Sequence, residues 1–168
     1  MISRSRLQAG FTLVELLIVV VILGVLAAIA IPQFSASTDD SKVAALDSTL
    51  NNLRTAVELY YQQHGAYPSA VAAGGAFGAI NTEAAFRDQL TNYTSAAGAA
   101  STTKDATYKY GPYLKKATLP ADPINGIATV EVITTGTLGM TATGSTGGWK
   151  FDNKTGQLIV NITAYQAR

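Results

Sequence analysis

Cysteine is absent from this chain of 168 residues, and histidine and tryptophan occur only once each. Without cysteine, no disulfide and no thiolate site can form, so redox usage does not identify the compartment. The lone His64 gives little support to a histidine metal cluster or a Ser-His relay. A phosphate-binding glycine loop and metal-ligand spacing are also missing. We therefore expect no catalytic residues and no enzymatic activity.

Charged residues are also scarce, at 14% of the chain, and the formal net charge is +1. Without Arg4 and Arg6, the only charges in the first ten residues, 10 basic side chains face 11 acidic ones. Such a balance does not favour electrostatic binding of nucleic acid by the whole body. Lysines interleaved with tyrosines between residues 104 and 116 could bind single strands, but a solvated loop explains them better. We do not expect nucleic acid as a partner.

What the chain has is one long apolar run. Residues 16–31 are all apolar or glycine, and Glu15 stands at their edge. A helix over residues 11–31 would span roughly 30 Å, the thickness of a bilayer core. A secretory signal peptide would share the basic start, and a plain membrane anchor would share the length. Neither accounts for a carboxylate at Glu15, which is costly in hydrocarbon.

The stretch "GFTLVELLIVVVILGVLAAIAIPQF" resembles the N-terminal segment of type IV pilins and type II secretion pseudopilins. The resemblance implies a leader peptide, residues 1–10, which a prepilin peptidase removes after Gly10. Phe11 would then be the mature N-terminus and would be methylated. Residues 11–33 would form a transmembrane helix that later becomes the polymerisation helix. The implied partners are this peptidase and methylase, membrane lipid, an inner-membrane assembly platform, and further copies of the chain in a helical homopolymer.

The same resemblance gives Glu15 a role in assembly. Cleavage creates a positive amine on Phe11, and an opposite charge offsets much of the cost of burying either group. Glu15 of one subunit can pair with the Phe11 amine of a neighbour and so fix the register between apolar helices. Pairing within one chain is an alternative, because the two residues lie about one helical turn apart.

Gly24 and Pro32 are the other candidate assembly residues. Proline removes a backbone donor and should kink or loosen the helix, while glycine lowers the helix propensity. The stretch between them could melt locally when subunits pack into a filament. Alternatively, Gly24 permits close helix packing and Pro32 marks the exit from the membrane.

From residue 34 to residue 64 the pattern is that of an amphipathic helix. Apolar and aromatic side chains recur at alternating spacings of 3 and 4, at Val43, Leu46, Leu50, Leu53, Val57, Tyr60 and His64. This single stripe predicts a helix that packs on a globular domain, or a short coiled coil. Gly65 follows in the position where helices end.

Residues 65–168 are expected to form a globular pilin-type domain with a variable loop. "TEAAFRDQLTNY" predicts a short helix capped by Thr82, with Phe86 and Leu90 facing inward. "TVEVIT", "WKF" and "QLIVNITAY" predict strands, the last two joined by a hairpin at "DNKTG". The fold class is therefore α+β, with a long N-terminal helix packed on a small C-terminal antiparallel sheet.

Two fragments, "GPYLKKATLPADPING" and "GWKFDNKTGQLIVN", resemble the major pseudopilin and pilin-type sheets, respectively. The chain departs from both patterns, because it lacks the pilin disulfide and the acidic loop that holds calcium in the pseudopilin. After Asp122 only Glu131 and Asp152 remain as acids, whereas a calcium site usually needs several oxygen ligands close together, so calcium is possible but poorly supported. We expect no cofactor.

The resemblance thus implies a structural filament subunit rather than an enzyme. The first interpretation is a type IV pilus subunit for adhesion, motility or surface attachment, held in the bacterial inner membrane and then assembled into an extracellular filament. The second is the major pseudopilin of a type II secretion system, in a periplasmic pseudopilus. A DNA-binding minor pilin is a third, weaker interpretation.

Overall fold

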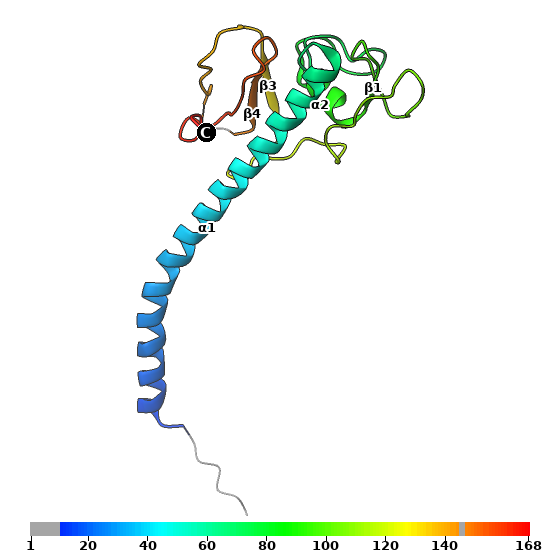
Figure 1. Ribbon diagram of the computed structural model, residues 1–168. Coiled ribbons are helices and arrows are strands. Elements are labelled where there is room, and N and C mark those ends of the chain that lie inside the picture. The colour runs from blue at the N-terminus through cyan, green and yellow to red at the C-terminus, as the bar shows by residue number, and fades with distance from the viewer. Residues whose placement is uncertain (1–10, 145–146) are drawn as a thin grey trace, which may run out of the picture. The chain divides into compact units, whose positions relative to one another are not determined.

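The structure is a computed structural model that describes residues 11–144 and 147–168, without the side chains of residues 30–32 and 34–36. The chain divides into a helical unit, residues 1–41, and a globular unit, residues 42–168. Helix α1, Leu13–His64, belongs to both units and is continuous in the backbone (Figure 1). The expected leader, residues 1–10, lies outside the described residues.

The stripe on the second half of α1 forms the centre of the globular core. Leu46, Leu50, Leu53, Val57 and Tyr60 are each at most 1% exposed. They recur every three or four residues, so they lie on one face of the helix. The prediction of a helix that packs on a globular domain is therefore confirmed, and the stripe buries itself within its own chain.

Helix α2, Glu83–Thr91, begins where its cap predicts. The hydroxyl of Thr82 accepts a hydrogen bond of 3.2 Å from the backbone N–H of Ala85, which would otherwise have no helical partner. Phe86 and Leu90 are fully buried and join the core cluster that contains the α1 stripe. The predicted cap and inward face of this helix are confirmed.

A three-stranded sheet closes the core in the order β3-β4-β5. Its strands are β3 Val130–Ile133, β4 Trp149–Asp152 and β5 Leu158–Val160. Strands β4 and β5 form the predicted antiparallel hairpin, with Phe151 opposite Leu158. Strand β3 pairs with β4 in parallel, so the sheet is mixed where a purely antiparallel one was expected. The long connection between β3 and β4 allows this return in the same direction.

The turn of the β4–β5 hairpin depends on Gly156. Its φ is +75°, a conformation that side chains with a Cβ rarely adopt. A Cβ at this position would also lie 2.2 Å from the ring of Tyr67. The backbone N–H of Gly156 donates to the carbonyl of Asp152 at 2.9 Å and closes the turn. The "DNKTG" signal therefore identified both the turn and the residue on which it depends.

Residues 65–120 are rich in loops, as expected, and contain one further pair of short strands. Strand β1, Tyr93–Thr94, pairs antiparallel with β2, Ala100–Ser101. Tyr110 forms an antiparallel bridge to Thr94 and so attaches the following loop to β1. The α+β class is thus confirmed, with a long helix, a short helix and two small sheets.

Candidate assembly site on helix α1

The first turn of α1 contains a reciprocal pair of hydrogen bonds between Thr12 and Glu15. The backbone N–H and the hydroxyl of Thr12 donate to Oε2 of Glu15 at 2.9 and 2.7 Å. The backbone N–H of Glu15 donates to Oγ1 of Thr12 at 3.2 Å. This is a capping box, which supplies partners for backbone N–H groups at the helix start. The negative carboxylate also lies at the N-terminal end of the helix, where the helix dipole favours it.

The capping box adds a partner for Glu15 that the sequence interpretation missed. The signal was present, because a threonine three residues before a glutamate and ahead of an apolar run is typical of this motif. Both hydrogen bonds that Thr12 donates to Glu15 go to Oε2. Among the described residues Oε1 of Glu15 accepts no hydrogen bond, so it can accept one from a further donor such as an amine. Pairing between Glu15 and the amine of Phe11 therefore stays a prediction, both between subunits and within one chain.

Gly10 and Phe11 are the residues on either side of the expected cleavage site. Gly10 lies outside the described residues. Phe11 is 76% exposed and precedes the first helical residue, Leu13. Cleavage after Gly10 and methylation of Phe11 stay predictions.

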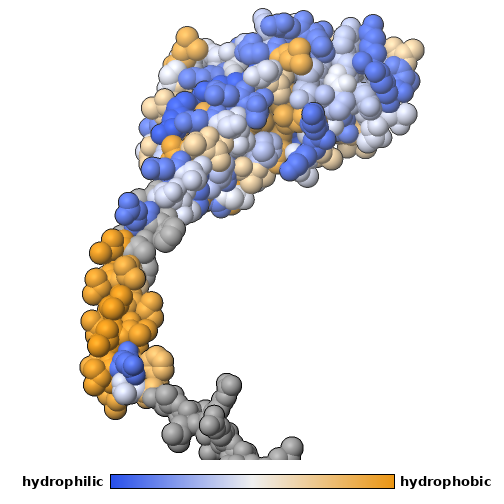
Figure 2. Space-filling view, turned by 60° about the horizontal axis from the view of Figure 1, so that its bottom comes forward, coloured by the Kyte–Doolittle hydropathy of each residue, from blue (hydrophilic) through white to orange (hydrophobic). Residues whose placement is uncertain are grey.

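The first half of α1 exposes apolar side chains on all sides. Thirteen large apolar residues between Leu13 and Ile29 are 47% to 84% exposed, including every residue from Leu16 to Leu23. In Figure 2 the visible face of this segment is almost uniformly hydrophobic. Burying one Val, Leu or Ile side chain is worth about 1.5–3 kcal/mol. A helix that is apolar around its whole circumference requires an apolar environment or partners on every side.

Among the residues whose structure is described, no helix meets the length and hydropathy of a membrane span. The expected transmembrane segment, residues 11–33, includes residues 30–32, whose side chains are not described.

Gly24 and Pro32, the other two candidate assembly residues, both lie within continuous helix. A Cβ added at Gly24 would meet no atom within 4 Å, so no contact inside this chain requires glycine there. A neighbouring helix that approaches closely would supply such a requirement. The backbone at Pro32 is helical, and its side chain lies outside the described set. Local melting between the two residues stays a prediction about the assembled state.

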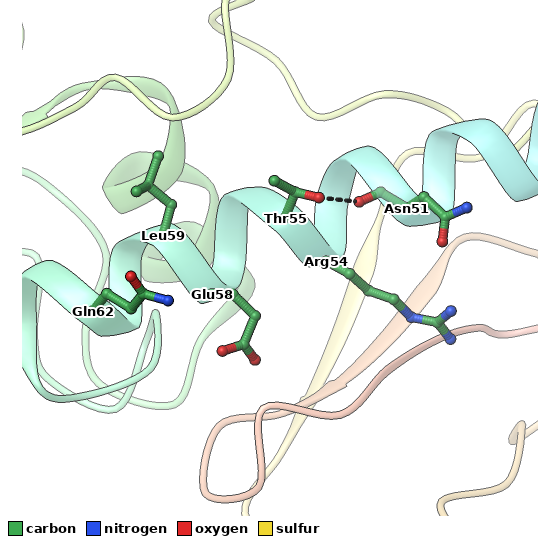
Figure 3. A pocket seen from close by; sticks show the side chains of 6 residues that line it. All are labelled: Asn51, Arg54, Thr55, Glu58, Leu59 and Gln62. Atoms are coloured by element: carbon green, nitrogen blue, oxygen red, sulfur yellow. Dashed lines mark hydrogen bonds between the residues drawn. The ribbon is translucent and has the colours of Figure 1, made fainter.

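The solvent-facing side of α1 in the globular unit contains a shallow groove of about 540 Å³. Figure 3 shows its lining, which consists of Asn51, Arg54, Thr55, Glu58, Leu59 and Gln62. The hydroxyl of Thr55 donates to the carbonyl of Asn51 at 2.8 Å, along the helix rather than into the groove. No residue of this lining is a histidine or a cysteine, and the lining holds no nucleophile–base pair.

The guanidinium of Arg54 leaves the groove to hold the C-terminal part of the chain. Its Nε and Nη2 donate to the carbonyl of Leu158 at 3.1 and 2.9 Å, and Nη2 also donates to the carbonyl of Arg168. Arg168 in turn forms an ion pair with Asp47, which lies about two helical turns before Arg54 on α1. These bonds join α1 to the last strand and to the end of the chain through charge-assisted contacts.

His64 closes the C-terminal end of α1 in a structural role. Its ring lies 4.1 Å from the ring of Tyr60, centroid to centroid, and Nε2 lies 2.9 Å from the hydroxyl of Tyr113 and 3.0 Å from that of Thr94. Burial lowers the pKa of His64 below its usual value, while the hydrogen bond to the carbonyl of Ala96 acts in the opposite direction. The surroundings therefore favour a neutral ring.

The carboxylates weighed for calcium serve to organise loops. Asp122 accepts four backbone N–H groups at 2.7–3.1 Å. Asp152 accepts the hydroxyl of Thr135 and two backbone N–H groups at 2.8–2.9 Å. Glu131 binds the hydroxyl of Thr143 and faces Lys150 at 3.5 Å. Within residues 11–144 and 147–168, no three His, Cys, Asp or Glu side chains gather as a metal site.

Comparison with known proteins finds similarity in the N-terminal part of the chain. Residues 5–31 match the model of the prokaryotic N-terminal methylation motif. The chain is 41% identical over 66 residues to the type II secretion system core protein G of Pseudomonas aeruginosa. These 66 residues are 39% of this chain and 46% of that protein. It is 54% identical over 54 residues to the type IV major fimbrial protein FimA of Dichelobacter nodosus, with 32% and 35% covered.

A third relative, the type IV major pilin protein PilE1 of Neisseria gonorrhoeae, is 36% identical over 87 residues, which are 52% of this chain and 41% of the pilin. The chain thus spans less than half the length of each of these three relatives. No solved structure matches the chain.

Proposed function

We propose that the chain, whose N-terminal segment is similar to type IV pilins and to the type II secretion core protein G, is a structural subunit of a helical filament. The observation behind the proposal is the first half of α1, where the thirteen large apolar side chains described between Leu13 and Ile29 are 47% to 84% exposed. Lipid can cover such a helix before assembly, and other copies of α1 can cover it afterwards. We propose a structural rather than a catalytic role.

The proposed pathway begins with removal of residues 1–10 and methylation of Phe11 by a prepilin peptidase at the inner membrane. An inner-membrane platform then draws the subunit into the filament, where Glu15 pairs with the amine of a neighbouring Phe11. Mass spectrometry of the N-terminal peptide tests the first step. An unmodified peptide that still begins at Met1 would contradict it.

The role of Glu15 is tested with two substitutions that separate charge from capping. Glu15→Gln keeps the side-chain carbonyl of a capping box and removes the charge, whereas Glu15→Ala removes both. We expect both variants to be cleaved and neither to assemble, because the amine needs a carboxylate partner. Sheared filaments are quantified by immunoblot, with Glu58→Ala, an exposed acid in the globular unit, as the control. Normal assembly of Glu15→Gln would refute the charge pairing.

The major pseudopilin of a type II secretion system is the second candidate, and it rests on the identity to core protein G. A long filament on the cell surface would favour an extracellular type IV pilus for adhesion, motility or attachment. Loss of protein secretion when the gene is deleted, without loss of surface filaments, would favour a short periplasmic pseudopilus. Neighbouring genes for a retraction motor, or for a secretin with secretion components, distinguish the two machines most directly.

A further inference from the structure

Charge is unevenly distributed in this chain. Helix α1 contains five acidic and two basic side chains, Lys42 and Arg54, which gives a charge of −3 with His64 neutral. The loop segment 101–118 has the opposite sign, with four lysines and only Asp105 as an acid, which gives +3. A chain with a net charge near zero thus has one acidic element and one basic segment.

Two of the four lysines in this segment contact aromatic rings and two do not. Lys104 lies 6.0 Å from the centre of the Tyr93 ring and Lys109 lies 5.2 Å from that of Tyr110, so both ammonium groups have cation–π contacts. Lys115 and Lys116 are exposed, and no carboxylate lies within 4.0 Å of either in the described part of the chain. They form two adjacent positive charges with no contact of opposite sign.

Two acids of α1 have the matching property. Asp39 and Asp40 are exposed and form no ion pair with any described residue. Asp47, by contrast, is paired with Arg168, and Glu15 is bound by Thr12. The helix therefore has one adjacent pair of free acids, and the loop has one adjacent pair of free lysines.

We propose that Lys115 and Lys116 of one copy dock on Asp39 and Asp40 of a second copy in the filament. The proposal rests on the proposed function and names a contact that the apolar packing of α1 does not supply. Apolar helices slide past one another at little cost, whereas opposite charges meet at one register and like charges repel. Complementary charge on one chain also favours association of identical copies over a monomer.

A single-stranded nucleic acid is the competing occupant of a segment rich in lysine and tyrosine. The structure favours a second copy, because lysines already cover the rings of Tyr93 and Tyr110, and His64 packs edge-on against Tyr110 at 5.2 Å. Bases need free aromatic faces for stacking.

Charge reversal tests the contact in cells that assemble filaments. The double variants Lys115→Glu/Lys116→Glu and Asp39→Lys/Asp40→Lys should each lower the sheared filament yield about tenfold, because like charges then face each other across the contact. Combining all four substitutions should restore the yield to within about twofold of wild type. Lys104→Glu/Lys109→Glu is the matched control. Combining it with Asp39→Lys/Asp40→Lys should not restore the filament yield that the aspartate reversal lowers. Wild-type yield from either double variant, or no rescue in the combination, overturns the proposal.

The absence of native cysteine allows a direct second measurement. Asp40→Cys combined with Lys116→Cys should give crosslinked dimers and a ladder with a short bis-maleimide in filaments, whereas Asp40→Cys combined with Lys104→Cys should stay monomeric. Equal crosslinking of the two pairs overturns the proposal. So does salt-sensitive binding of an oligo-dT strand that Lys115→Glu/Lys116→Glu abolishes while the filament yield is unchanged. If wild-type filaments contain none of this chain, the proposed function itself fails, whatever the variants do.

Discussion

Tyr60 offers the sharpest test of the packing on the α1 stripe. Its side chain is fully buried, and its hydroxyl has no hydrogen-bond partner among the described residues. The hydroxyl packs against the backbone at Gly98, because a Cβ added to Gly98 would lie only 2.7 Å from the hydroxyl oxygen. The same burial raises the pKa of Tyr60 well above its usual value.

Tyr60→Phe should therefore stabilise the globular unit. A buried polar group without a partner costs about 1–3 kcal/mol, and phenylalanine has the same ring without that cost. For a unit of this size, each kcal/mol corresponds to roughly 3–5 °C in Tm. Thermal unfolding of the detergent-solubilised chain, followed by circular dichroism, should thus show a Tm at least about 3 °C above wild type.

Tyr113→Phe is the matched control, because the chemical change is the same and the surroundings are opposite. The hydroxyl of Tyr113 donates to Gln63 at 2.7 Å and lies 2.9 Å from Nε2 of His64. Its removal should lower the stability by about 1 kcal/mol. A lower Tm for Tyr60→Phe would refute the reasoning, since it would mean that the Tyr60 hydroxyl has a partner in solution.

Three further changes probe the same unit. Leu53→Ala removes a fully buried side chain from the α1 stripe and should lower the free energy of unfolding by about 2–5 kcal/mol in a urea titration. A decrease below about 1 kcal/mol would argue against the packing. Arg54→Met should lower the free energy of unfolding by about 1–3 kcal/mol in the same titration, because the carbonyl of Leu158 loses two donors. An unchanged midpoint would mean that the hydrogen bonds from Arg54 to Leu158 are not formed. The lowered pKa of His64 means that the unfolded chain takes up a proton at higher pH than the folded chain, so stability is full above about pH 6.5 and decreases as the pH falls below it. His64→Gln should flatten the dependence of Tm on pH between 7 and 5, and an unchanged slope would assign it to other groups.

Local signals predicted the helices and the hairpin well. The spacing of Leu46, Leu50 and Leu53 fixes one face of a helix, and Thr82 caps α2 through a bond that spans three residues. The "DNKTG" turn closes through Gly156 and Asp152, four residues apart. Each of these features depends on neighbours in sequence, so the pattern contains the information needed.

Features that depend on distant residues were not predictable in this way. The parallel pairing of Val130 with Trp149 has no turn signal, because its connection is long and irregular. All three residues of β5 are buried, including Ile159, whereas a strand with one buried face would alternate buried and exposed residues. Arg54 reaches a carbonyl 104 residues further along the chain. In the candidate site, Glu15 was recognised from its apolar setting, while its local partner Thr12 was overlooked.

The continuity of α1 has a mechanical consequence. Tension on the apolar end of the helix would enter the globular unit along the helix axis, as shear on the face that contains Leu46 to Tyr60. Shear loads many contacts together, whereas peeling breaks them one after another. The bonds from Arg54 to Leu158 and Arg168 join α1 to the last strand and to the end of the chain and would share the load. The stripe that folds the domain is therefore also the element that would set how much pulling force one subunit withstands.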